Sequence, residues 1–116
     1  MSEETELIFG LYRYIKKASE YLGSKTSSEM IKDQKTFDAI CFCFVMIEEI
    51  AKRILENKKI LEEVKDVDFT KIASYKKEIF INDGLDYMKM YEVIQNEFPF
   101  LQIKLGEKIG AITYGK

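Results

Sequence analysis

Apolar side chains near the start of the chain recur every three or four residues, which is the spacing of one face of an α-helix. The positions that follow this spacing are Leu7, Ile8, Leu11, Ile15, Ala18 and Leu22. Glutamates crowd the beginning of the segment, where the positive end of a helix dipole favours them. Gly23 is a natural stop, because glycine readily ends a helix. The pattern predicts a first helix over about residues 4–22.

A longer helix is predicted from Thr26 to about Asn57. Thr26 and Glu29 match the capping box, in which the threonine caps a backbone N–H of the first turn and the glutamate binds the threonine N–H. The middle of this helix, residues 37–47, has one charged residue and is apolar on every side. A membrane span needs about 20 apolar residues. The shorter run therefore has to be covered by protein on more than one side.

A buried β-strand is the alternative interpretation of residues 37–47, because Phe, Val, Ile and Cys also suit a strand. The run continues without a turn signal into residues 48–55, where apolar and charged side chains follow helical spacing. This continuity favours one long helix.

The next cap signal comes after a short helical turn expected within residues 58–66. Asp68 is the predicted N-cap of a third helix, and Val67 and Ile72 are the apolar pair that fixes the entry of the chain. Residues 82–84, with the sequence Asn-Asp-Gly, end this helix because they favour a turn.

The same cap pattern repeats at Asp86, with Leu85 and Met90 as the apolar pair. We expect the fourth helix that begins there to end at Pro99, because proline interrupts a helix. Beyond it, alternating apolar residues and two glycines predict a short irregular tail over residues 102–116.

The composition agrees with one globular domain built from these helices. The chain has 116 residues, of which 47% are hydrophobic and 33% charged, and this balance is typical of a folded domain. The sequence therefore predicts an all-α fold, a four- to five-helix up-and-down bundle that occupies residues 1–116 as a single helical domain.

The charge and the N-terminus limit the expected partners. A net charge of −2 gives no general attraction to phosphate backbones or anionic membranes, so weak or no nucleic-acid binding is expected, and no membrane binding. The opening Met1-Ser2-Glu3-Glu4 has neither the basic nor the apolar region of a signal peptide. A cytoplasmic location is the resulting prediction.

The residue types exclude several kinds of chemistry. The chain has no histidine, which removes the commonest general base and the commonest metal ligand. Cys41 and Cys43 point about 200° apart on a helix, so they share neither a metal nor an unstrained disulfide, and we expect them to be small buried apolar residues. The glycines form no phosphate-binding loop. We therefore predict no cofactor and no metal, and a binding function rather than a catalytic one.

Three segments of the chain, in order, carry a family resemblance: Glu49-Ile-Ala-Lys-Arg-Ile54, Val67-Asp-Phe-Thr-Lys-Ile72 and Tyr91-Glu-Val-Ile-Gln-Asn-Glu-Phe-Pro-Phe-Leu101. They are similar to a Glu-Ala-Ala-Lys-x-Leu segment, an aromatic-x-x-Ile helix start and a Trp-x-x-Ile-x-x-x-Leu-Pro-x-Leu ending. Together the segments resemble the HEPN superfamily, and within it the HepT-like proteins of toxin–antitoxin loci. The resemblance covers residues 37–101 and implies a dimeric all-α fold and a nucleotidyltransferase-type partner protein.

The defining ribonuclease motif of that family is altered here. Its Arg, His and Tyr positions fall on Lys76, Ile81 and Asp83. Lysine keeps a positive charge but not the bidentate geometry of arginine, and isoleucine transfers no proton. The resemblance thus implies no catalytic residue here, and a remnant phosphate-contact site at Lys76, Lys77 and Asp83. A catalytically degenerate, dimeric interaction module that binds protein, nucleotide or RNA is the leading hypothesis.

Two alternatives stay open. In the first, the chain is an active ribonuclease variant that uses Lys76, Lys77, Asp83 or Asp86. In the second, it is an unrelated helical-bundle interaction protein. A homodimer is expected in the leading case, because one small domain hardly covers a helix that is apolar all round. The predicted dimer-interface residues are Phe37, Ile40, Cys41, Phe44 and Val45.

Overall fold

The computed structural model describes residues 2–81 and 84–112. The chain forms, in order, α1 (Glu3–Leu22), α2 (Ser27–Lys32), α3 (Gln34–Leu55), α4 (Lys58–Glu63), α5 (Phe69–Ile79), β1 (Phe80–Ile81), β2 (Gly84–Leu85), α6 (Tyr87–Glu92), the π-helical turn η1 (Val93–Glu97) and α7 (Phe98–Gly110). The predicted all-α fold is confirmed.

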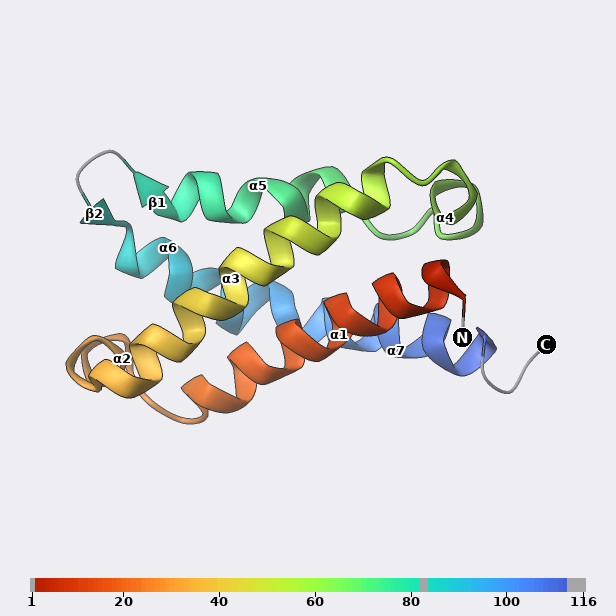
Figure 1. The fold of residues 1–116 in the computed structure, drawn as a ribbon. Coiled ribbons are helices and arrows are strands. Elements are labelled where there is room, and N and C mark those ends of the chain that lie inside the picture. Colours follow the sequence, from red (N-terminus) through yellow and green to blue (C-terminus); the bar gives the residue numbers. More distant parts are fainter. Residues whose placement is uncertain (1, 82–83, 113–116) are drawn as a thin grey trace.

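The long helices reverse direction from one to the next (Figure 1). Helix α3 is central, with α1 packed along one side and α5 along another, and α7 packs against α1. The antiparallel pair β1 and β2 joins α5 to α6, with Phe80 opposite Leu85 and Ile81 opposite Gly84. The strand interpretation of residues 37–47 is wrong, because this segment is the first half of α3.

The helix starts follow the predicted caps. Thr26 and Glu29 form both bonds of the capping box, with N···O distances of 3.1 and 2.9 Å. Asp68 and Asp86 each accept the backbone N–H of the residue three positions on, at 3.0 Å. The short helical turn expected after Asn57 is also present as α4.

The helix predicted from Thr26 to Asn57 is divided at Asp33, so the prediction of one helix there is wrong. Asp33 has extended backbone angles, φ −92° and ψ 92°, and is the N-cap of α3. Its carboxylate accepts the backbone N–H of Thr36 at 3.2 Å and the Thr36 hydroxyl at 2.9 Å. An aspartate that makes these local bonds competes with the helical backbone, and this separates α2 from α3.

The irregular tail predicted for residues 102–116 is wrong over most of its length, because α7 continues to Gly110. Pro99 lies in the first turn of α7, where the missing N–H breaks no helical bond. The wider π-helical turn before it carries the chain into α7, since the N–H of Phe98 reaches back five residues to the carbonyl of Val93. Residues 113–116 lie outside the described part of the chain.

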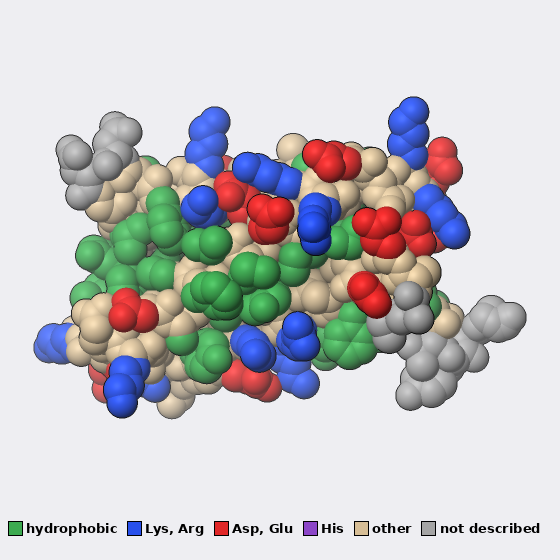
Figure 2. Space-filling model, viewed as in Figure 1, with side chains coloured by type: hydrophobic (Ala, Val, Ile, Leu, Met, Phe, Trp, Pro, Cys, Tyr) green, Lys and Arg blue, Asp and Glu red, His purple; other side chains and the backbone are tan. Residues whose placement is uncertain are grey.

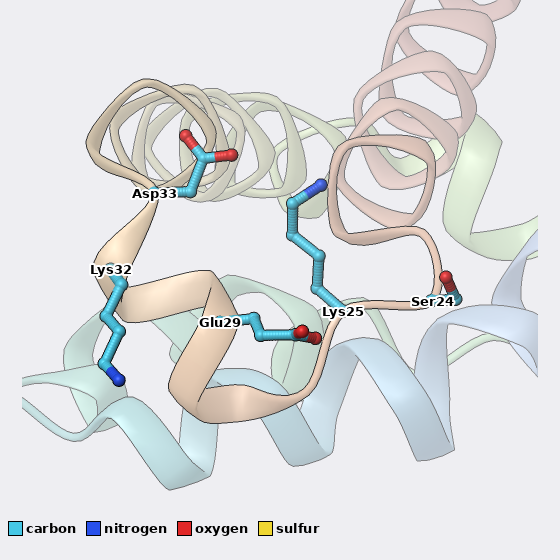
Figure 3. Close-up of a pocket in the computed structure, with 5 residues that line it drawn as sticks. All are labelled: Ser24, Lys25, Glu29, Lys32 and Asp33. Carbon is cyan, nitrogen blue, oxygen red and sulfur yellow. The ribbon is translucent and has the colours of Figure 1, made fainter.

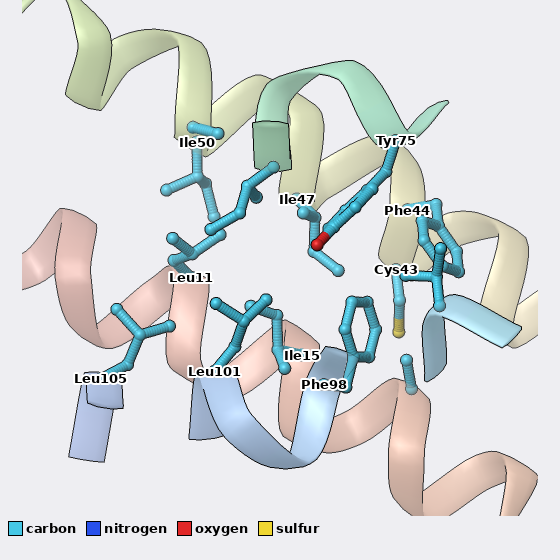
Figure 4. Close-up of a cluster of buried hydrophobic side chains, with 14 of the residues drawn as sticks. Leu11, Ile15, Cys43, Phe44, Ile47, Ile50, Tyr75, Phe98, Leu101 and Leu105 are labelled. Atoms are coloured by element: carbon cyan, nitrogen blue, oxygen red, sulfur yellow. The ribbon is translucent and has the colours of Figure 1, made fainter. Parts of the chain in front are cut away.

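The core contains an aromatic cluster that joins three helices. Phe44 of α3, Tyr75 of α5 and Phe98 of α7 point toward one another (Figure 4). Ring centroids are 5.5 Å apart for Phe44 and Phe98, 6.5 Å for Phe44 and Tyr75, and 6.0 Å for Tyr75 and Phe98. The Tyr75 hydroxyl donates to the Glu97 carboxylate at 2.5 Å. Burial raises the pKa of Tyr75 most, and this hydrogen bond raises it further.

In residues 2–81 and 84–112, none of the helices combines the length and the hydropathy needed to cross a membrane.

Candidate interaction surface

Helix α3 presents apolar side chains on two sides. The inward side supplies core residues, which are Ile40, Cys43, Phe44, Ile47, Ile50, Ala51 and Ile54. On the outward side the side chains of Phe42 and Val45 are exposed, at 56% and 38%. The remaining helices of the chain therefore leave part of the apolar middle of α3 uncovered, as expected for a helix without a polar face.

The five predicted interface residues do not share one surface. Ile40 and Phe44 are 0% exposed and lie in the core, so placing them at an interface is corrected: their own chain already encloses them. Phe37 and Cys41 are partly buried, and the ring centroids of Phe37 and Tyr87 are 5.5 Å apart. Val45 is on the outward side.

Helix α1 completes the exposed apolar surface. The Tyr14 ring meets the Phe42 ring edge to face, with centroids 6.1 Å apart. Figure 2 shows hydrophobic side chains gathered at the centre of this view, where α1 and α3 run side by side. We call this surface the α1–α3 face and define it by Tyr14, Cys41, Phe42, Val45 and Met46.

A groove continues the α1–α3 face toward the N-terminal end of α1. Its volume is about 380 Å³, and its lining is Glu3, Glu6, Leu7, Gly10, Arg13, Tyr14, Met46, Ile50 and Arg53. Gly10 allows the two helices to approach here, because a Cβ atom at this position would lie only 3.3 Å from the Ile50 side chain. The groove thus has an apolar floor and charged edges of both signs.

Basic side chains border the α1–α3 face on the side of α1. The Arg13 guanidinium and the Lys17 ammonium lie 5.6 and 5.8 Å from the centroid of the Tyr14 ring, within the range of cation–π contacts. Both cations therefore lie over the Tyr14 ring, at the α1 edge of the face. The face therefore has an aromatic centre and a charged rim, as interfaces commonly do.

The remnant site predicted at Lys76, Lys77 and Asp83 is only partly described. The Lys76 ammonium is 3.2 Å from a carboxylate oxygen of Glu48, whose other oxygen is 3.6 Å from Lys52. A phosphate at Lys76 would therefore have to compete with a carboxylate that is already in place. Lys77 is exposed, and Asp83 lies outside the described residues.

The cysteines have the environment expected of packing residues. Cys43 is 1% exposed and Cys41 is partly buried. Burial raises the pKa of both thiols to about 11, and the charge of Asp38 adds to the effect at Cys41. The reactive form of cysteine is the thiolate, so both side chains are poor nucleophiles at neutral pH.

A second hollow of about 460 Å³ lies beside α2 (Figure 3). Its lining is charged or polar: Ser24, Lys25, Glu29, Lys32 and Asp33. Both carboxylates already cap helices, Glu29 through the N–H of Thr26 and Asp33 through the N–H of Thr36. The carboxylates of this hollow are therefore already engaged in helix caps, and the α1–α3 face is the stronger candidate.

The sequence interpretation missed the contribution of α1 to the α1–α3 face. The apolar spacing of the first helix does not include Gly10, Arg13 and Tyr14, so the helical pattern gave these residues no role. A usable signal was present in Tyr12-Arg13-Tyr14, followed by Lys16-Lys17, because aromatic and basic residues interleave there on the polar side of an amphipathic helix.

Comparisons with models of protein families, with curated proteins and with solved structures returned no match to this chain.

Proposed function

We propose that this chain is a catalytically degenerate HEPN-like domain that acts as a dimeric interaction module, with the α1–α3 face as the contact between two copies. The observation that supports it best is Phe42, which is 56% exposed in the middle of the longest helix. Its neighbours on the face, Tyr14 and Val45, make the exposed surface continuous across two helices.

The physical reason for association is the apolar surface that one copy leaves in water. Burying a side chain such as Phe or Val contributes about 1.5–3 kcal/mol relative to leaving it exposed. A contiguous apolar patch rimmed by polar residues is a common mark of an association site. Two-fold contact is the commonest solution, because one such surface then serves both partners.

The resemblance to HepT-like proteins supports the same proposal independently. It implies a dimer and, in the same locus, a nucleotidyltransferase-type partner in the cytoplasm. The altered positions Lys76 and Ile81 favour binding over catalysis, since Lys76 faces Glu48 and isoleucine has no titratable group.

Light scattering at micromolar concentration tests the dimer directly. We expect a mass of about 27 kDa, twice the 13.6 kDa of one chain. A mass of one chain that persists at the highest soluble concentration would contradict the proposed dimer.

Ribonuclease activity is expected to be absent from the purified protein. The position of the family histidine is Ile81, and removing a general acid or base typically lowers a rate by about 10²- to 10⁴-fold. The assay is cleavage of single-stranded RNA, with a Lys76→Ala variant as the control for contamination. Cleavage by the wild type that disappears in Lys76→Ala would support the active-variant hypothesis instead.

A further inference from the structure

We infer that the two copies pack their α3 helices antiparallel about a two-fold axis near Val45 and Met46, so that Phe42 of each copy enters the groove of the other. This inference rests on the proposed dimer and specifies its geometry. It follows from the order of charges along α3, from the position of the groove and from the mixed charge of the groove edges.

A row of exposed side chains runs along the outward side of α3 and ends at the residue after the helix. At three- and four-residue spacing the row reads Lys35, Asp38, Phe42, Val45, Glu49, Arg53 and Glu56, and Gln34 and Lys52 are exposed beside it. Residues at this spacing lie on one face of a helix. The row therefore has apolar residues in its middle and charges at both ends.

The order of these charges favours one direction of packing. In an antiparallel pair centred between Val45 and Met46, Lys35 lies opposite Glu56 and Asp38 lies opposite Arg53, and the two-fold axis repeats both pairs. In a parallel pair each residue would lie opposite its own copy, so like charges would meet. Opposite charges across an interface fix its register, whereas like charges oppose association.

The same antiparallel arrangement brings Phe42 to the groove. Phe42 of one copy then lies opposite Glu49 and Ile50 of the other, and Ile50 is part of the groove floor. A cavity of about 150 Å³ is enough to hold a benzene ring, so a groove of about 380 Å³ has room for a phenylalanine side chain. The surface is therefore self-complementary, with a projecting ring and a receiving groove two helical turns apart.

The charges at the groove edges fit a second copy better than a partner of one charge sign. Glu3 and Glu6 lie at the edge together with Arg13 and Arg53. A strongly acidic or strongly basic segment would meet like charges on one side of the groove. A second copy presents both signs, since its α3 row has Lys35 and Arg53 as well as Asp38 and Glu56.

Charge reversal with mixing tests this arrangement. Asp38→Arg and Arg53→Asp are each expected to raise the dimer dissociation constant about tenfold, because each homodimer then has two like-charge contacts. When the two variants are mixed, every Arg again faces an Asp across the interface. Native mass spectrometry with one isotopically labelled variant should therefore show heterodimers well above the statistical share. Glu107→Arg on α7 is the control and should leave the wild-type dissociation constant unchanged.

The outcomes separate the inference from the proposed dimer. If the wild type is dimeric but the two variants dimerise as tightly as it does, or mix statistically, the antiparallel register is wrong and the dimer stands. If the wild type is monomeric, both are wrong. The heterodimer preference should also shrink as ionic strength rises, because salt screens exposed charge pairs. A preference that is insensitive to salt would contradict the assigned charge pairs.

Discussion

Replacing Phe44 with alanine is expected to lower the free energy of unfolding by about 3–5 kcal/mol. The Phe44 side chain is 0% exposed and contacts the rings of both Tyr75 and Phe98, so its removal leaves a cavity where α3, α5 and α7 meet. Urea denaturation followed by circular dichroism, at one fixed protein concentration, measures the change.

Phe100→Ala on α7 is the matched control for this measurement. The Phe100 side chain is 55% exposed, and the Lys104 ammonium lies 5.7 Å from its ring centroid. Exposed substitutions away from special features usually change stability by about 0.5 kcal/mol or less. Equal losses for Phe44→Ala and Phe100→Ala would mean that Phe44 does not hold the core together.

Local capping rules identified most of the helix starts from sequence. Thr26, Asp68 and Asp86 each satisfy a backbone N–H in their own first turn, so the signal lies within four residues of sequence. Asp33 has the same chemistry, but it lies between two helical segments without a glycine or proline to mark the break. The continuous helical periodicity on both sides hid this cap.

The error at Pro99 has a different origin. Proline interrupts a regular α-helix, and that rule led to the prediction that the fourth helix ends at Pro99, whereas Pro99 lies in the first turn of α7. The π-helical turn at Val93–Glu97 changes the backbone hydrogen bonds before the proline, and nothing in the local sequence signals such a turn. Tertiary burial then sustains α7, since Leu101 and Leu105 pack into the core.

The composition of α3 predicted an uncovered apolar surface but not the residues that form it. Helical spacing groups residues by face, yet it does not say which face meets the core when every face is apolar. The structure resolves this, because Ile40 and Phe44 are buried in the core while Phe42 and Val45 face outward. The groove needs two helices, α1 and α3, and therefore follows from packing and not from any single segment.

Replacing Phe42 with glutamate is expected to convert the dimer to a monomer while leaving the helical fold intact. The substitution places a charge at the centre of the apolar contact, and central aromatic residues of interfaces typically contribute about 2 kcal/mol or more to binding. We expect the dissociation constant to rise about a hundredfold, which corresponds to about 3 kcal/mol. Sedimentation equilibrium measures the dissociation constant, and circular dichroism verifies the helical content.

Ile103→Glu on α7 is the control that distinguishes the α1–α3 face from a general effect of adding charge to an apolar surface. Ile103 is 61% exposed, slightly more than Phe42 at 56%, and it lies outside the α1–α3 face. The same chemical change should therefore leave the dissociation constant of the dimer unchanged. Dissociation by Ile103→Glu with no effect of Phe42→Glu would move the contact from α3 to α7. A loss of helical content in Phe42→Glu would show instead that Phe42 supports the fold of its own chain, and the Asp38 and Arg53 variants would then be the remaining test of the face.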